Sequence, residues 1–167
     1  MLSTRSASPG TSVAYNGCMD KLLLLTHPTT GAIAILATLW TFVEALNASG
    51  RNHARMWWAS LIGATMMAAT AIGGGYWYVV YYAVDKAAIL EGPWPIAHTL
   101  VMEAKEHIFF VTLVLSLLLP IIIRKEDLSM NRGAIWLALT VAALVVLSAF
   151  AIEGAGAFIA MAARISS

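Results

Sequence analysis

Charge is scarce in this sequence, and the scarcity argues against several classes of function. Asp, Glu, Lys and Arg make up 11% of the 167 residues, and the net charge is +1. No basic stripe lies outside two short links, so a nucleic-acid-binding surface is not expected. The single cysteine, Cys18, cannot form an intrachain disulfide, and we assign it no role. The only glycine run, Gly73 to Gly75, follows no strand and lies inside an apolar segment, which argues against a phosphate-binding loop.

Apolar residues, by contrast, are abundant. They make up 60% of the chain, and the mean hydropathy is +0.78, as is typical of an integral membrane protein. Each of four apolar runs exceeds the roughly 20 helical residues that cross a hydrocarbon core about 30 Å thick: Leu22 to Leu46, Met56 to Val84, Ile96 to Ile123 and Gly133 to Ala163.

These runs lack the alternating pattern of barrel strands, and backbone polar groups in lipid must be satisfied within the protein. The sequence therefore predicts an all-α integral membrane protein folded as an antiparallel bundle of four transmembrane helices. We expect a polar N-terminal tail over residues 1–20 and a single four-helix domain over residues 21–167. The tail is not expected to be a signal peptide, because the apolar run after it is too long for one.

The positive charges are concentrated in two links that this arrangement places on the same side of the membrane. The first link carries Arg51 and Arg55, and the link over residues 124–132 carries three more basic residues. Short cytoplasmic loops carry an excess of Lys and Arg, so this side is predicted to be cytoplasmic. Both termini would then lie on the outer side of a multi-pass protein of the cell inner membrane. Glu44, near the cytoplasmic side, is expected to pair with Arg51 or Arg55.

The third run is unusual because it begins with a group of ionisable side chains. Its ionisable residues are His98, Glu103, Lys105, Glu106 and His107. Such residues are costly in lipid and mark a functional site by default. On a helix they spread over more than half of the circumference, so no single stripe can hide them all. We therefore expect this helix to be surrounded by protein, including other membrane subunits.

Glycines on the second and fourth runs indicate places where another group approaches the backbone. Three consecutive glycines each weaken a helix by roughly 1 kcal/mol relative to Ala, so another helix or a flat ligand is expected at Gly74 and Gly75. On the fourth run, Glu153 is followed by Gly154, which places a carboxylate beside small residues. Both groups occur toward the outer ends of their runs.

The depth of His27 depends on where the first helix begins. The helix begins either near position 21, with Pro28 as a kink, or at Pro28, with His27 as its cap. At about 1.5 Å per residue, His27 would lie roughly 10 Å from the outer end in the first case. Gly74, Glu153 and His107 would lie roughly 15, 16 and 18 Å from theirs. All four residues are thus predicted to share a layer in the outer half of the membrane.

Histidines on different transmembrane helices, with glycines at the same level, fit a b-type haem. Two neutral imidazoles supply its axial ligands, and the flat macrocycle needs positions without side chains. His107 is the expected first ligand, and His27 or His98 the second, with the glycines at 74, 75 and 154 leaving room. In helix number and in His and Gly placement, the plan resembles small four-helix membrane cytochromes of the b type. It carries no motif specific to one family.

The predicted function is therefore that of a b-type haem electron-transfer subunit within a larger respiratory or redox complex, which would be a membrane oxidoreductase. The chain has no soluble domain able to bind NAD, so electrons would come from a quinol, a partner subunit or a soluble carrier. Glu103 and Glu153 are expected to couple protons to the redox step. Glu103 lies one turn from His107 and could hydrogen-bond its free imidazole nitrogen.

Three alternatives use the same residues differently. His107, His27 and His98 could bind a copper, zinc or iron ion together with Glu103, Glu106 or Glu153. The ionisable groups could form a proton or ion path. The chain could also be an accessory subunit without a cofactor, whose charges pair with a neighbour. A two-haem cytochrome is disfavoured, because no histidine partner for His53 occurs on the cytoplasmic side.

Overall fold

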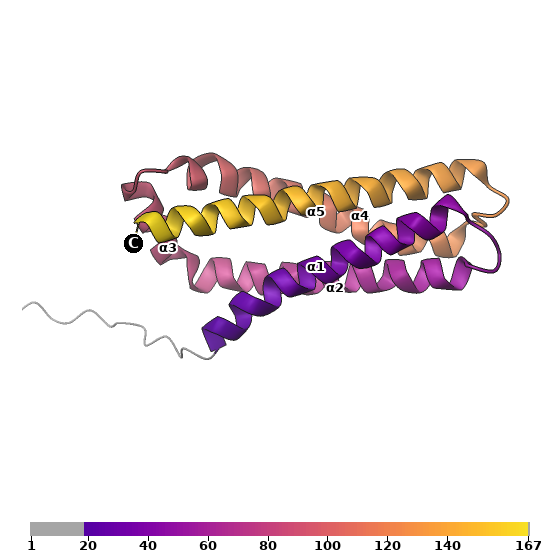
Figure 1. Ribbon diagram of the computed structural model, residues 1–167, viewed down its shortest axis with the longest axis horizontal. Helices are drawn as coiled ribbons and strands as arrows, with labels where there is room; N and C mark the ends of the chain where they lie inside the picture. Colours follow the sequence, from indigo (N-terminus) through magenta and orange to yellow (C-terminus); the bar gives the residue numbers. More distant parts are fainter. Residues whose placement is uncertain (1–18, 167) are drawn as a thin grey trace, which may run out of the picture.

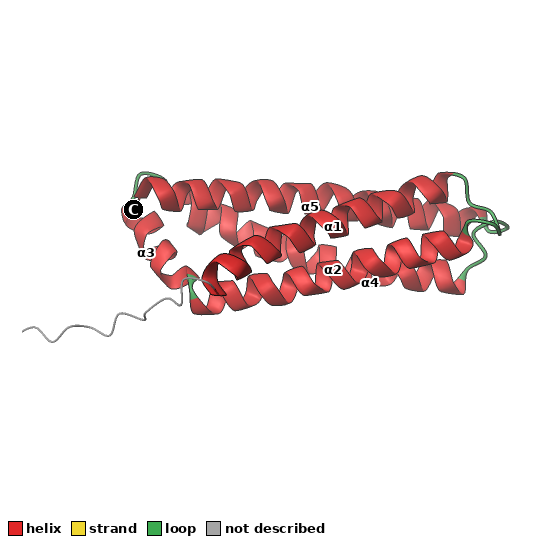
Figure 2. Ribbon diagram, turned by 60° about the horizontal axis from the view of Figure 1, so that its bottom comes forward, coloured by secondary structure: helices red, strands yellow, loops and turns green. Residues whose placement is uncertain are grey.

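The computed structural model describes residues 19–166, and every regular element in that range is helical (Figures 1 and 2). The elements are α1 (Met19–Leu46), α2 (His53–Val80), α3 (Tyr82–Glu91), a short π-helix η1 (Ala97–Met102), α4 (Glu103–Lys125) and α5 (Arg132–Ser166). Residues 1–18 of the predicted polar tail, Cys18 included, lie outside the described residues.

Four stretches of helix within residues 19–166 are long and apolar enough to cross a membrane. They are Leu25–Leu46, His53–Val80, Ala97–Lys125 and Arg132–Ser166, close to the runs expected from hydropathy. The prediction of an all-helical, multi-pass membrane protein is thus confirmed for this range. Helix α1 begins at Met19 and continues through Pro28. Of the two predicted starts, the structure therefore has the earlier one, near position 21.

The links between α1 and α2 and between α4 and α5 lie at one end of the molecule, and the C-terminus lies at the other (Figure 1). We name these the loop end and the α3 end, because α3 lies near the C-terminus. Each long helix packs against two others: α1 on α2 and α5, and α4 on α2 and α5. The four helices therefore enclose a common interior.

This interior contains two apolar cores. The larger, which we name the loop-end core, includes the fully buried Ile123 and Val145 and extends from the loop end past the middle of the bundle. Small residues let its helices approach closely: a Cβ added to Gly63 would lie 2.8 Å from Oγ1 of Thr38. The smaller core lies at the α3 end and contains Tyr82 and Ile89.

Helix α3 occupies most of the segment between the second and third membrane runs. Tyr82 and Ile89, seven residues apart on one face of α3, are both buried. A helix also satisfies the backbone polar groups of this segment beside the membrane, which an irregular loop would leave to water. Asp85 on α3 is half-buried, and this burial raises the pKa of its carboxyl group above the ordinary value.

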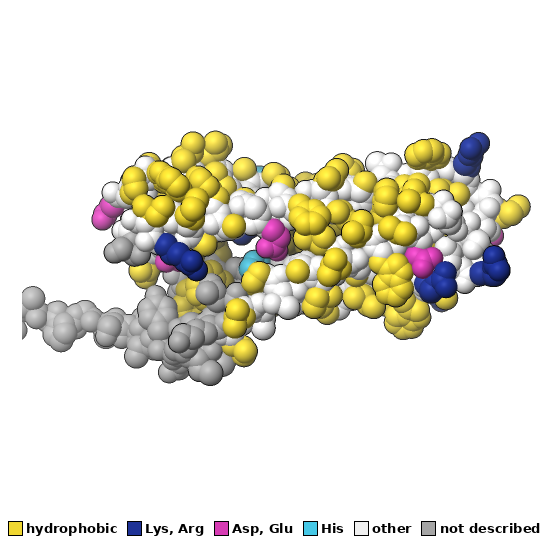
Figure 3. Space-filling model, viewed as in Figure 1, with side chains coloured by type: hydrophobic (Ala, Val, Ile, Leu, Met, Phe, Trp, Pro, Cys, Tyr) yellow, Lys and Arg dark blue, Asp and Glu magenta, His cyan; other side chains and the backbone are white. Residues whose placement is uncertain are grey.

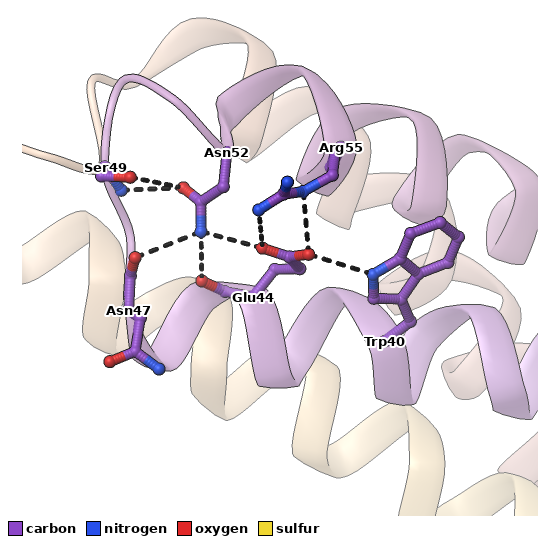
Figure 4. A network of polar contacts seen from close by, with 6 residues as sticks. All are labelled: Trp40, Glu44, Asn47, Ser49, Asn52 and Arg55. Atoms are coloured by element: carbon purple, nitrogen blue, oxygen red, sulfur yellow. Dashed lines mark hydrogen bonds and ion pairs between the residues drawn. The ribbon is translucent and has the colours of Figure 1, made fainter.

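Glu44 is held in a polar network at the loop end (Figure 4). Its carboxylate forms an ion pair with Arg55, with 3.0 Å between Nε and Oε1, and accepts a hydrogen bond from the Trp40 indole at 3.2 Å. Nδ2 of Asn52 donates to the same carboxylate at 2.9 Å and to the Glu44 main-chain carbonyl at 3.0 Å. The predicted pairing of Glu44 with a basic residue of the link is confirmed, with Arg55 as the partner.

Candidate functional site

Polar side chains from four helices, together with the glycines that they face, gather between the two apolar cores. We name this group the polar cluster. It consists of His27, Thr30 and Gly31 from α1, Thr70 and Gly74 from α2, Lys105 from α4, and Glu153 and Gly156 from α5. Figure 3 shows a largely hydrophobic face on which an acidic side chain lies beside a histidine, far from the charges at the ends. Three of the four residues that were predicted to share a layer, His27, Gly74 and Glu153, are members of the polar cluster.

His27 extends from α1 onto the backbone of α2. Its Nδ1 lies 3.1 Å from the main-chain carbonyl oxygen of Thr70. A carbonyl oxygen only accepts, so Nδ1 is the donor and Nε2 of the neutral ring carries the lone pair. A Cβ added to Gly74 would lie 2.6 Å from Cε1 of His27. The group that approaches the backbone at Gly74 is thus the imidazole of the neighbouring helix.

Threonine hydroxyls strengthen the same contact between α1 and α2. The Thr70 hydroxyl donates to the Thr30 hydroxyl at 2.8 Å and also lies 2.9 Å from the Met66 carbonyl oxygen, the alternative acceptor within its own helix. Thr30 in turn donates to the main-chain carbonyl of His27 at 2.9 Å. The His27 imidazole is therefore held in place by hydrogen bonds that connect its own turn of α1 with the turn of α2 that contains Thr70.

Glu153 and Lys105 extend toward glycines in the same way. The Glu153 carboxylate lies directly against Gly31 of α1, where an added Cβ would overlap with Oε1. The Lys105 ammonium lies against α5, with Nζ 3.2 Å from the place of a Cβ at Gly156, one turn beyond Glu153. The charges of Lys105 and Glu153 attract each other across the contact between α4 and α5. Each ionisable member of the polar cluster thus faces a glycine on another helix.

His107 and Glu103, by contrast, are exposed on the outer face of α4. Nδ1 of His107 lies 2.7 Å from the main-chain carbonyl oxygen of Glu103. The imidazole is thus oriented by the backbone, and not by the Glu103 carboxylate that we had expected to position it. Because the carbonyl accepts from Nδ1, the neutral ring presents Nε2 as its free lone pair.

His98 lies in the π-helix η1 and is buried. Its Nδ1 is 3.1 Å from the hydroxyl oxygen of Tyr82, whose ring stacks on Tyr78 with 5.2 Å between centroids. Burial, followed by the neighbouring ionisable groups, raises the pKa of the Tyr82 hydroxyl to about 12, so it remains a hydrogen-bond donor at neutral pH. His98 is thus engaged at the α3 end, with a residue that we had not singled out.

The three candidate histidines therefore contact three different elements: α2 for His27, α3 for His98 and its own helix for His107. Within residues 19–166, no group of three or more His, Cys, Asp or Glu side chains is placed to hold a metal ion. At Gly75 and Gly154, a Cβ would have no neighbour within 4 Å among the described residues 19–166.

The sequence contains a signal for the members of the polar cluster that we did not predict. His27, Thr30 and Gly31 have the i, i+3, i+4 spacing of one helix face, and Thr70 and Gly74 are four apart. Polar and small residues at helical spacing on adjacent helices thus indicate a contact. We interpreted the glycines as places for another helix or a flat haem and missed that Gly31, Gly74 and Gly156 each face a polar side chain on another helix.

Comparisons with known proteins assign no family to this arrangement. No family model, curated protein or solved structure matches the chain. The function is therefore inferred from the geometry of the described residues alone.

Proposed function

We propose that the chain is a membrane-embedded electron-transfer subunit that holds a b-type haem where its α4 helix meets another membrane subunit. His107 is the axial ligand that this chain supplies. The proposal is supported above all by the contact between His107 Nδ1 and the Glu103 carbonyl oxygen, 2.7 Å long. A histidine that binds iron commonly donates its other ring N–H to such a carbonyl, which fixes both the tautomer and the ring orientation.

The surroundings of His107 favour a site shared between subunits. His107 and Glu103 are exposed on a helix that spans the membrane, where polar groups facing lipid are costly. A neighbouring subunit would cover them and supply the second axial ligand. His27 and His98 are the other candidate ligands of this chain, but their Nδ1 atoms contact α2 and α3. A haem bound at His107 would carry one electron at a time between a quinol or soluble carrier and the partner subunit.

The proposed orientation places the loop end in the cytoplasm and both termini on the outer side, with antiparallel helices in the cell inner membrane. The basic residues near the loop-end links favour this orientation because short cytoplasmic loops are rich in Lys and Arg. They are Arg51, Arg55, Arg124, Lys125 and Arg132. His107 and the polar cluster would then lie in the outer half of the bilayer.

An absorption spectrum tests the haem proposal directly. Dithionite-reduced membranes that contain the protein and its partner subunits should show Soret and α bands, and His107→Ala should abolish both. His53→Ala is the matched control, because His53 begins α2 at the opposite end of the bundle, and it should retain the bands. Bands missing from the parent protein, or undiminished in His107→Ala, would contradict the proposal. Analysis of the same sample for copper, zinc and iron tests the metal-site alternative.

The polar cluster supports a second candidate function, which is a proton path. A carboxylate, an amine and an imidazole from three helices, namely Glu153, Lys105 and His27, meet between two apolar cores. Such groups can exchange protons with one another and with a redox step on the outer side. Proteoliposomes that enclose a pH-sensitive dye test this function: Glu153→Gln should abolish proton uptake, and Glu126→Gln in the loop should not. Equal uptake by both variants would remove the candidate.

A further inference from the structure

A groove lies between α2 and α4 at the loop end of the bundle. Its volume is about 510 Å³. The floor is formed by small side chains of α2, Ala64 and Ala68, which are four residues apart on one face. Leu61 of α2 and Leu117 and Ile121 of α4 form apolar walls. The groove is therefore shaped for a slender apolar group.

Two cations lie at the loop end of this groove, which we call its mouth. Arg124 and Lys125 of the last turn of α4 are among the lining residues, and both are exposed. The Arg124 guanidinium lies 5.1 Å from the ring centroid of Trp57, which also lines the groove. This cation–π contact holds one positive charge at the mouth. A Trp at this level is also typical of the zone where lipid headgroups meet the hydrocarbon core.

Among residues 19–166, no ion pair joins Arg124 or Lys125 to an acidic side chain. Glu126, which with Lys125 lines a second hollow between α4 and α5, accepts a hydrogen bond from Asn131 at 2.9 Å. The Asp127 carboxylate accepts hydrogen bonds from Ser129. No acidic side chain is among the residues that line the groove. The mouth thus retains two cations.

The dimensions of the groove match one leaflet of a bilayer. Trp57 and Ala68 are eleven residues apart on α2, which is roughly 16 Å along the helix axis. Half of a hydrocarbon core about 30 Å thick is about 15 Å. A molecule with its charge at Arg124 and Lys125 would therefore extend an acyl chain as far as the bilayer midplane.

We propose that this groove is a binding site for an anionic phospholipid. The phosphate is held by Arg124 and Lys125, and one acyl chain lies over Ala64 and Ala68. Anionic lipids are selected over zwitterionic ones because the two cations at the mouth have no acidic partner there, and a choline group would add a third positive charge. The site does not depend on the haem proposal, since it lies at the opposite end of α4 from His107.

Binding of defined lipids to the purified full-length protein in detergent tests this site. The probes are phosphatidylglycerol and phosphatidylcholine with identical acyl chains, and native mass spectrometry counts the molecules retained. We expect one phosphatidylglycerol to be bound in preference. Replacing both cations, Arg124→Gln with Lys125→Gln, should weaken its binding about thirtyfold, because each cation contributes about 1 kcal/mol toward an anionic headgroup.

Two further variants separate the groove from its charges. Ala68→Leu fills the floor and should reduce phosphatidylglycerol retention while both cations remain. Arg132→Gln removes an exposed cation at the same end that does not line the groove, and it should leave binding unchanged. Lys125→Gln alone, an exposed substitution that should not impair folding, should weaken binding by about fivefold, the share of one cation.

Several results would overturn the proposal. Equal retention of the two lipids, or unchanged binding in Lys125→Gln, would show that the cations do not select the headgroup. Unchanged binding in Ala68→Leu would remove the acyl chain from the groove. A last experiment measures the melting temperature of the protein with phosphatidylglycerol and, separately, with phosphatidylcholine and inorganic phosphate. If inorganic phosphate raises the melting temperature as much as phosphatidylglycerol does, the site binds a free anion and not a lipid.

Discussion

The loop-end core and the polar cluster are built from the same four helices but bring them together by different means. In the loop-end core, fully buried aliphatic side chains such as Ile123 and Val145 fill the interior. In the polar cluster, a polar side chain of one helix faces a glycine of another, as His27 faces Gly74. In lipid there is no hydrophobic driving force between helices, so close packing and interhelical hydrogen bonds must stabilise their association. The chain uses the first means at one level and the second at another.

The largest difference between the two regions should appear when a side chain of the loop-end core is truncated. Ile123→Ala should lower the free energy of unfolding by about 2–5 kcal/mol, because it leaves a cavity among fully buried neighbours. Ile121→Ala is the control, since Ile121 is 55% exposed on the same helix and should lose far less. Reversible unfolding in mixed micelles measures both. Similar losses would mean that the core is not tightly packed.

Gly74→Ala breaks the other kind of contact. Its methyl group would lie 2.6 Å from Cε1 of His27, so the imidazole must move away from Thr70. Overpacking of this kind costs about 1–3 kcal/mol. Gly75→Ala is the matched control, because its methyl group would meet no atom within 4 Å in the described part of the chain and should stabilise the helix by about 0.5–1 kcal/mol. If the two variants unfold alike in the same micelles, His27 does not pack on Gly74.

Thr70→Val tests the hydrogen bonds of the polar cluster without changing the volume of the side chain much. It removes the contact between the hydroxyls of Thr70 and Thr30, which is 2.8 Å long. Interhelical hydrogen bonds in membranes contribute about 0.6 kcal/mol on average, so a loss near that value is expected. Thr65→Val, at an exposed position on the same helix, should have no measurable effect. A double-mutant cycle with Thr30→Val isolates the pair.

The smallest expected effect is a pH dependence at the loop end. Hydrogen bonds from the hydroxyl and the backbone N–H of Ser129 hold the pKa of Asp127 below its ordinary value of 3.8. Because the pKa is lower in the folded state, these hydrogen bonds contribute fully to the stability of the folded loop above pH 3.8. Their contribution is lost as the pH falls below this value and Asp127 becomes protonated. The protection of the Ser129 amide, measured against its intrinsic exchange rate, should therefore fall in this range, and Asp127→Asn should remove this change in protection. Unchanged protection in the parent protein would contradict this assignment.

Hydropathy predicted the four spans because the length of an apolar run is a direct consequence of bilayer thickness. It did not predict α3, since ten residues with only two buried side chains produce no strong periodic pattern. The pairing of Glu44 was predictable because carboxylate and guanidinium lie close together across a short link. Helix α1 could begin on either side of His27 by sequence alone, because Pro is tolerated both in a first turn and at a kink.

Depth along a helix was the information that the sequence supplied about the candidate site, and direction around the helix was what it lacked. His27 and Glu153 share a layer and also face the interior. His107 was expected in that layer too, but it is exposed on α4. A difference of two residues turns a side chain by about 200°, so small errors in helix phase decide whether a histidine faces a neighbour or lipid.

The π-helix η1 decides this phase for the third membrane span. Its hydrogen bonds skip one residue more than those of an α-helix, so the helix gains about one residue, or roughly 100°, before α4 begins. This angular offset lets His98 face Tyr82 while His107, on the same continuous span, is exposed. A homologue with one residue fewer between positions 97 and 102 would have a span of similar length. In that span, however, His98 and His107 could not both keep their present directions, one toward Tyr82 and the other outward. The offset therefore makes the orientation of the whole third span depend on the number of residues in this short segment, whose other side chains, such as Ala97 and Met102, belong to the small apolar core at the α3 end.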